Sequence, residues 1–459
     1  MKLSKTESKA PAKPIKAISG FAVAISMSTL LLISVALTLT SIKQALVLAI
    51  GLLVLPHLLR LKIYSLWNFA FFANAALLSF PNREFHSIDL MTVLSMCVIT
   101  LILIKNALEK AAGSSKIVEF KHTNMRVVAL SALAFVVLIV LSSALGGNSA
   151  SILGWINGTI MVIALVVMPK SRLPRFLSIC RAIVIAMAIS VAYDLSFLIQ
   201  GRGFDVGTYN GGRFGGSLGD YELTGEYVGV CILLGITVLI NDDSKRWKTL
   251  AVALVLGSLP ILIATQSRGP VLLLIVLVPV YLIVMVVSKQ RRKGRAVMLL
   301  LVLTLAVMGN FSAYSRSNSF DRIAGLHLDG SFASTLNRES VWSYFRELAT
   351  YKNAGPIGNG VSYPYEEIGT YPHSLYLWLF WSFGYLGVLA IGLMICAILI
   401  LLLRRAARKD VQCISALAIL VFVLADEAKI EAARFSASVA FFWVVIALAI
   451  VAIRRSEIR

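Results

Sequence analysis

The sequence is poor in charge and in cysteine, and each shortage excludes a class of protein. Only 14% of the 459 residues are charged, whereas 58% are hydrophobic. The mean hydropathy of +0.84 is far above that of a soluble domain, so we expect one polytopic membrane protein rather than several soluble domains. The five cysteines all lie in or beside apolar segments, which argues against a disulfide framework and against a cysteine-based zinc site.

Several binding motifs are also missing. Neither a Walker pattern nor a Rossmann fingerprint occurs, so the sequence gives nucleotide binding no support. No cluster of side chains has metal-ligand spacing, and there is no Asp-x-Asp pair of the kind that a metal-dependent nucleotide-sugar transferase uses. The net charge of +20 does not indicate nucleic acid, because the basic residues fall in short clusters between apolar runs. We therefore expect no metal, no cofactor and no nucleic-acid partner.

Apolar runs fill most of the chain, and they predict an all-α membrane protein with about 14 transmembrane helices, since a helix of about 20 apolar residues crosses a bilayer. The long run from 374 to 403 contains Gly384 and Gly387, which predict a short outer helix kinked into a true span. The expected spans lie near residues 17–40, 43–60, 65–81, 87–108, 127–145, 151–168, 176–198, 222–240, 249–265, 270–288, 296–312, 374–403, 412–427 and 436–453.

The distribution of Lys and Arg predicts the orientation of these spans. Cytoplasmic loops collect basic residues, and every second loop of this chain is basic, beginning with the N-terminal tail. The loop 289–295 is strongly basic, whereas the loop 146–149 carries no positive charge. We therefore expect a multi-pass protein with both termini in the cytoplasm and the lipid bilayer as its surroundings.

One polar stretch of about 60 residues, 312–372, interrupts the apolar pattern. So large a polar segment between spans is costly to keep and is the natural place for chemistry. It divides the chain into N-terminal helices with an outer loop at 200–221 (1–311), a partly helical extracytoplasmic loop that we expect to be catalytic (312–373), and C-terminal helices (374–459).

Two arginines lie at expected outer connections. Arg213 belongs to the glycine-rich stretch 200–221, whose backbone amides can approach a ligand closely. Arg268 lies at a tight turn between two apolar runs, where a charge is costly and is usually functional or paired. A guanidinium grips a phosphate group with two parallel hydrogen bonds. The alternative for both residues is an arginine that reaches lipid headgroups.

The long polar loop holds further candidates. A helix is expected over 336–348, with Asn337 as its N-cap and Arg338 at its positive end, well placed for an anion. Trp342 belongs to an apolar stripe that we expect to pack onto the membrane domain. His373 follows Pro372 and is expected to begin the next helix, where the helix dipole and nearby arginines keep its imidazole neutral and able to accept a proton.

Together these motifs resemble those of the O-antigen ligase and polymerase superfamily of bacterial membrane proteins. The resemblance covers about residues 200–390 and implies a helical membrane glycosyltransferase fold of the GT-C type. It rests on Gly-Gly-Arg213, on Ser-Arg268-Gly, on Asn-Arg338 followed by Trp342 and Gly358-Asn-Gly360, and on His373-Ser-Leu-Tyr376-Leu running to Gly384-Tyr-Leu-Gly387.

The resemblance implies transfer of a glycan from an undecaprenyl-diphosphate donor at the outer face of the cytoplasmic (inner) membrane, in cell-envelope biogenesis. The acceptor would be lipid A core for a lipopolysaccharide ligase, or another repeat unit for a polysaccharide or exopolysaccharide polymerase. In a related protein O-oligosaccharyltransferase it would be a protein hydroxyl. The family's diphosphate-binding arginines correspond to Arg268 and Arg338, with Arg213 as a third, and the family's general base corresponds to His373. Supporting roles would fall to Tyr376, Trp342 and Asn337.

A transporter or flippase of lipid-linked saccharides is the main alternative. Such a protein would carry charges deep in several spans and would show internal repeats. Here the clear charges inside spans are Arg181 and Asp194, and no repeat is evident. A non-catalytic assembly protein of the envelope ranks third.

Overall fold

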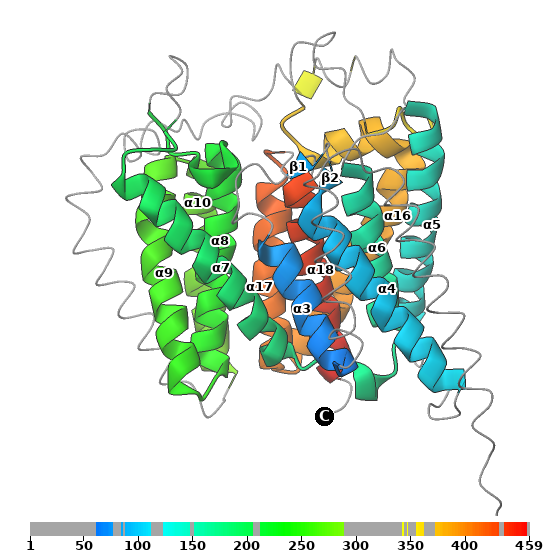
Figure 1. Cartoon of the computed structure of the whole chain (residues 1–459), viewed down its shortest axis with the longest axis horizontal. Helices are drawn as coiled ribbons and strands as arrows, with labels where there is room; N and C mark the ends of the chain where they lie inside the picture. Colours follow the sequence, from blue (N-terminus) through cyan, green and yellow to red (C-terminus); the bar gives the residue numbers. More distant parts are fainter. Residues whose placement is uncertain are drawn as a thin grey trace, which may run out of the picture.

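The computed structural model of this chain describes residues 61–76, 84–85, 88–111, 123–146, 151–204, 212–288, 342–343, 347, 355–361, 372–430 and 436–456. Within these residues the chain consists of helices and their connections, apart from one antiparallel pair of two-residue strands, β1 (Glu84–Phe85) and β2 (Ile88–Asp89). The long helices form one bundle (Figure 1). They are α3 (Ile63–Ala75), α4 (Leu90–Ala111), α5 (Thr123–Gly146), α6 (Ser151–Val167), α7 (Phe176–Ile199), α8 (Tyr221–Asn241), α9 (Lys245–Thr265), α10 (Arg268–Val287), α16 (Leu375–Ala407), α17 (Val411–Asp426) and α18 (Ser436–Ser456).

Seven described helices are long and apolar enough to cross a membrane, namely α5, α7, α8, α9, α10, α16 and α18. Shorter apolar stretches lie in α4, α6 and α17. Every expected span between residues 65 and 288 and after residue 374 corresponds to one described helix. The expected spans 17–40, 43–60 and 296–312 lie outside the described residues. The helical membrane architecture is therefore confirmed, while the total of about 14 spans stays a prediction.

Local sequence sets where several helices begin and end. The carboxylate of Asp220 caps α8 by accepting hydrogen bonds from the amides of Glu222 (2.7 Å) and Leu223 (3.0 Å). Helix α9 ends where Gln266 takes a left-handed conformation, with φ of 51°. The chain then turns back at once, so that α10 begins at Arg268.

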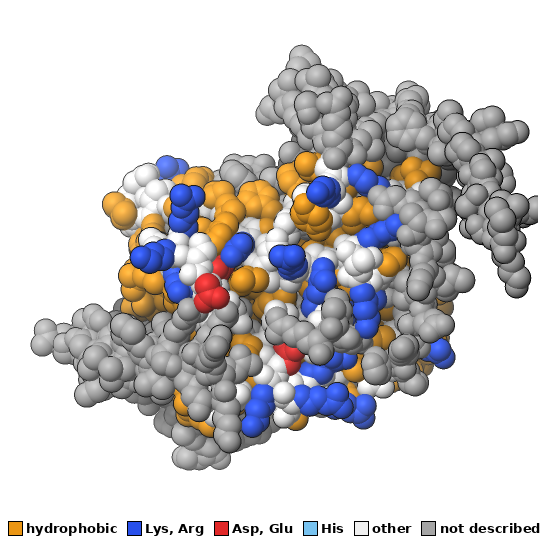
Figure 2. Space-filling model, turned by 90° about the horizontal axis from the view of Figure 1, so that it is seen from below, with side chains coloured by type: hydrophobic (Ala, Val, Ile, Leu, Met, Phe, Trp, Pro, Cys, Tyr) orange, Lys and Arg blue, Asp and Glu red, His pale blue; other side chains and the backbone are white. Residues whose placement is uncertain are grey.

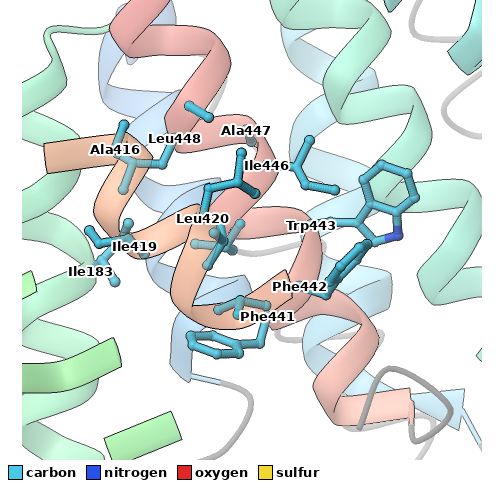
Figure 3. Packing of buried hydrophobic residues seen from close by; sticks show 14 of the residues in the cluster. Ile183, Ala416, Ile419, Leu420, Phe441, Phe442, Trp443, Ile446, Ala447 and Leu448 are labelled. Atoms are coloured by element: carbon cyan, nitrogen blue, oxygen red, sulfur yellow. The ribbon is translucent and has the colours of Figure 1, made fainter. Parts of the chain in front are cut away.

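Helices α8 and α18 form the interior of the bundle. Of their apolar stretches, 89% and 94% are buried, compared with 33% for α10, whose other faces are left for lipid. Helix α18 packs on α6 and α17, and Figure 3 shows its aromatic run Phe441–Trp443 near Leu420 of α17. Lipid tails are as apolar as these side chains, so the hydrophobic effect does not drive the helices together within the membrane. Close packing of the side chains stabilises the bundle instead.

Helix α16 is broken, as the sequence predicted. Gly384 has φ of 63° and ψ of −170°, a conformation that is essentially restricted to glycine. The part before the break runs across the upper end of the bundle in Figure 1, and the part after it descends through the bundle.

The segment 355–361 of the long polar loop fills the break in α16. Beyond the break, the amides of Tyr385 and Leu386 donate to the carbonyls of Gly355 (3.3 Å) and Pro356 (3.1 Å). Before the break, the carbonyls of Trp381 and Ser382 accept from the amides of Asn359 (2.8 Å) and Gly360 (3.1 Å). The break leaves these backbone groups without hydrogen-bond partners inside the helix, and the loop segment supplies the partners instead.

The two ends of the bundle differ in charge. The end at which α7 and α9 begin and α16 and α18 end carries many Lys and Arg side chains and few acidic ones (Figure 2). The opposite end holds the connection between α7 and α8, the turn between α9 and α10, the start of α16 and the turn between α17 and α18. All the described candidate residues, Arg213, Arg268, Trp342, His373 and Tyr376, belong to this second end.

Candidate functional site

The glycine-rich connection between α7 and α8 folds into a compact loop that holds Arg213. Phe204 and Phe214 form an isolated antiparallel bridge, and the amides of Gly215 and Gly216 donate to the carbonyl of Gly203. The amide of Phe214 donates to the carbonyl of Ala264 at the end of α9 (3.0 Å), which ties the loop to the turn before Arg268. The glycine-rich stretch therefore has a defined fold over its described residues.

Arg213 is buried, with 7% of its surface exposed. Its guanidinium carbon lies 4.2 Å from the ring centre of Tyr221, the first residue of α8. Its Nε atom has no hydrogen-bond partner in the described part of the chain. A buried N–H without such a partner is costly, so this Nε favours a hydrogen-bond acceptor.

Arg268 is the first residue of α10 and is half-buried. The charged group that acts on it is Arg213, a group of the same sign. Two guanidinium groups of like charge, one of them at the positive end of a helix, give this part of the bundle an excess of positive charge. The geometry thus brings together the two arginines that the sequence singled out in separate loops.

His373 lies just before α16 and not within it, which corrects the prediction that it begins the helix. Helix α16 starts at Leu375 with Ser374 as its N-cap, and His373 takes a left-handed conformation with φ of 46°. Side chains other than glycine adopt this conformation rarely, and such residues cluster at functional sites. The indole N–H of Trp342 donates to the carbonyl of His373 at 3.4 Å, so the predicted supporting residue Trp342 does contact this turn.

The remaining predicted residues divide into two groups. The hydroxyl of Tyr376 donates to the carbonyl of Leu424 in α17 (2.7 Å), so Tyr376 joins α16 to α17. Asn337 and Arg338 lie outside the described residues, and their roles stay predictions.

Three charged residues that sequence reasoning missed form a cluster that reaches Gly269 at the start of α10. Glu226 in α8, Asp426 at the end of α17 and Lys429 in the following turn interact electrostatically. The Lys429 ammonium lies 3.3 Å from Oδ1 of Asp426, and both side chains are almost fully buried. Glu226 is 3% exposed. The sequence did contain one signal for this cluster, since the carboxylate of Glu226 lies inside the apolar run 222–240. Ionisable residues at membrane depth are usually functional or paired.

Burial and the neighbouring acidic groups act on Lys429 in opposite directions. Burial alone would lower the pKa of its amine, but the neighbouring carboxylates of Asp426, Glu222 and Glu226 raise that pKa above its usual range. Within the described residues, Lys429 thus has acidic neighbours, whereas the charged group that acts on Arg268 is another arginine.

The turn that carries Lys429 also holds the start of α16. The amide of Leu375 donates to the carbonyls of Glu427 and Ile430, each at 2.9 Å. On its other side the turn packs against Gly269, where a Cβ atom would lie 1.7 Å from Cε of Lys429. The turn 426–430 therefore links the segment of His373 to the segment of Arg268.

The charges expected inside spans, Arg181 and Asp194, have structural partners. Arg181 forms two hydrogen bonds with the carboxylate of Asp242, at 2.7 and 2.9 Å. Asp194 accepts a hydrogen bond from the amide of Ser217 at 2.8 Å and so supports the loop that carries Arg213. Neither residue needs a transport pathway to explain its presence.

No known protein family and no curated protein matches this sequence. The function is therefore inferred from the site itself. The site has two arginines of like charge that act on each other and, at the same end of the bundle, a histidine in a left-handed backbone conformation.

Proposed function

We propose that this protein is a membrane glycosyltransferase that moves a glycan from a polyprenyl-diphosphate donor, of the undecaprenyl type, to a hydroxyl acceptor. The single observation that supports this most is the pair Arg213 and Arg268, whose like charges act on each other, and of which the buried Nε of Arg213 has no hydrogen-bond partner among the described residues. A diphosphate group supplies the oxygens that such a pair favours. The apolar helix faces around it are suited to the polyprenyl chain.

The proposed reaction is a single displacement. The imidazole of His373 takes the proton of the acceptor hydroxyl while that oxygen forms a bond to the anomeric carbon. The bond from this carbon to the diphosphate oxygen breaks, and its electron pair leaves with polyprenyl diphosphate. Arg213 and Arg268 stabilise the negative charge that develops on the leaving group. Attack opposite to the leaving group inverts the anomeric configuration, and this scheme assigns no step to a metal.

The orientation proposed for this reaction follows from the charge of the two ends. The basic end (Figure 2) faces the cytoplasm under the positive-inside rule, which places the arginines and His373 at the outer face of the cytoplasmic membrane. A lipid-linked donor is reached there after it has crossed to the outer leaflet. The acceptor, whether lipid A core, a growing repeat-unit glycan or a protein hydroxyl, would enter from the same side.

The decisive experiment is transfer from a polyprenyl-diphosphate-linked glycan in membranes that contain the protein. We expect His373→Ala to abolish the product and Arg268→Lys to lose most of it, because lysine keeps the charge but not the two-pronged hydrogen bonding. Arg202→Lys is the matched control, since Arg202 is an exposed arginine of the same outer end. Near-normal product from correctly inserted His373→Ala protein would exclude this histidine as the base. Parallel reactions with each acceptor class identify the acceptor.

A further inference from the structure

Two buried carboxyl groups meet between α8 and α17. Glu226, near the start of α8, is 3% exposed, and its Oε2 atom has no hydrogen-bond partner among the described residues. Asp426, at the end of the neighbouring helix α17, is fully buried, and its Oδ2 atom also lacks such a partner there. The two groups act on each other electrostatically. Two acidic side chains of like charge therefore share one interior region of the bundle, where an ionised group is costly.

One lysine lies beside this pair. The ammonium of Lys429 is 3.3 Å from Oδ1 of Asp426, and it also acts on Glu226. Lys429 and Asp426 pack against the backbone of Gly269, where a Cβ atom would lie 1.7 Å from Cε of the lysine and 2.6 Å from Oδ1 of the aspartate. The single positive charge balances one of the two carboxylates, and the second carboxylate is left in excess.

The elements packed against α8 bring other charged side chains to this end of the bundle. In the described chain they are Asp194, Arg202, Arg213, Asp220, Glu222, Arg268 and Glu427, while the charged residues of α9 lie at its opposite end. Arg202 is exposed, and Arg268 has Arg213 as the charged group that acts on it. The basic group that acts on both Glu226 and Asp426 is Lys429. Glu222 also acts on Lys429, which adds to the acidic excess.

A buried carboxylate that lacks a compensating charge takes up a proton, because its ionised form is too costly there. Where two carboxyl groups share a site, the proton belongs to the pair. We propose that Glu226 and Asp426 bind one proton between them at neutral pH. This proton-binding site lies beside the turn 426–430, whose carbonyls hold the amide of Leu375 at the start of α16. Loss of the proton would place a second buried negative charge next to that turn. The inference does not depend on the proposed reaction.

Infrared difference spectroscopy of the full chain in detergent tests this site, because a protonated carboxyl group has a C=O band that a carboxylate lacks. At neutral pH the parent should show such a band, and Glu226→Gln and Asp426→Asn should each lose it, since the carboxyl group that remains pairs with Lys429 in its ionised form. Lys429→Met should roughly double the band, because both groups then bind a proton. Asp242→Asn is the matched control: Asp242 forms two hydrogen bonds with Arg181, so its replacement should leave the band unchanged.

Thermal unfolding across pH covers the case in which Asp426→Asn or Lys429→Met does not fold. The unfolded chain releases the proton above about pH 4 while the folded parent keeps it, so the stability of the parent falls as the pH rises from there. Glu226→Gln has nearly the shape of the protonated acid and cannot ionise. This variant should match the parent at about pH 4 and unfold at a higher temperature than the parent at about pH 7.

Three results would overturn the proposal. The first is a neutral-pH spectrum in which Glu226→Gln removes no carboxylic acid band. The second is an Asp426→Asn protein that keeps the whole band, which would mean that the proton is not shared. The third is a Glu226→Gln protein that matches the parent in acid but is less stable than the parent at neutral pH, because an ionised Glu226 paired with Lys429 would then be stabilising the fold.

Discussion

Arg213 stacks on Tyr221, with its guanidinium carbon 4.2 Å from the centre of the phenol ring. The two residues come from different elements, the glycine-rich loop and the first turn of α8, and the ring presents its face to the cation. Stacking fixes the plane of the guanidinium while its N–H groups, which lie at the edge of that plane, remain able to donate. The contact with Tyr221 therefore orients the guanidinium of Arg213.

This stacking predicts a graded response to changes at Tyr221. Tyr221→Phe keeps an aromatic face and should retain most donor or pyrophosphate affinity, whereas Tyr221→Leu should weaken it by roughly threefold to tenfold, since a cation–π contact contributes about 0.5–2 kcal/mol. Binding curves of the two purified variants check this. Equal affinities for Phe and Leu would show that the ring face does not orient Arg213.

The break in α16 predicts a difference between two glycines of one helix. Gly384→Ala should destabilise the folded protein by at least about 1–3 kcal/mol, because alanine does not tolerate this backbone conformation and its Cβ would lie 2.5 Å from the carbonyl oxygen of Gly355. Gly392→Ala is the control, since no atom lies within 4 Å of its added Cβ. Thermal unfolding in detergent measures both. A stable Gly384→Ala protein would mean that the break is not required.

The orientation can be tested with two exposed arginines. Arg202→Cys, at the end that holds the site, should react with a membrane-impermeant thiol reagent added to spheroplasts, and Arg408→Cys, at the basic end, should react after lysis alone. The background requires replacement of the native free cysteines, of which Cys396 is exposed. The reverse labelling pattern would place the arginine pair in the cytoplasm and remove the basis for an outer-leaflet donor.

The ion pair at the basic end predicts an acid-dependent loss of stability. Although burial alone would raise the pKa of Asp242, hydrogen bonds from Arg181 and from the amide of Ser244 hold that pKa below its usual value. A carboxyl group with a lowered pKa in the folded state stabilises it above the unfolded pKa of about 4, and this contribution disappears as the pH falls through the folded pKa.

The corresponding experiment compares the parent with Asp242→Asn across pH. The variant should unfold at a lower temperature near pH 7, and the difference between the two proteins should begin to shrink below about pH 4 and vanish once the pH falls below the lowered pKa of folded Asp242. A difference that is independent of pH would assign the effect to packing at the start of α9.

Much of the fold was predictable because it depends on local sequence. Apolar runs of sufficient length define the helices, and in the described chain their ends agree with the structure to within a few residues over most elements. The break in α16 could be predicted because Gly384 lies inside a run too long for one span. Arg213 and Arg268 were predicted to lie at connections on the same side of the membrane, but no sequence pattern predicted that their charges act on each other.

The cluster around Lys429 was not predictable in the same way. It depends on contacts between α8, the turn at Gly269 and the turn after α17, which are far apart in the sequence. The conformation of His373 was missed for a related reason. The start of α16 is fixed by the carbonyls of Glu427 and Ile430, which pair with Leu375, and no pattern around residue 373 contains that information.

The filling of the α16 break by residues 355–361 has a consequence for how the protein is made. Four backbone groups of α16 depend on this segment for their hydrogen bonds, and exposing such groups to lipid costs several kcal/mol each. The segment precedes α16 in the chain and is synthesised first, so it is available when the helix leaves the ribosome. A chain that lacks residues 355–361 should therefore bring α16 into the membrane without these hydrogen-bond partners.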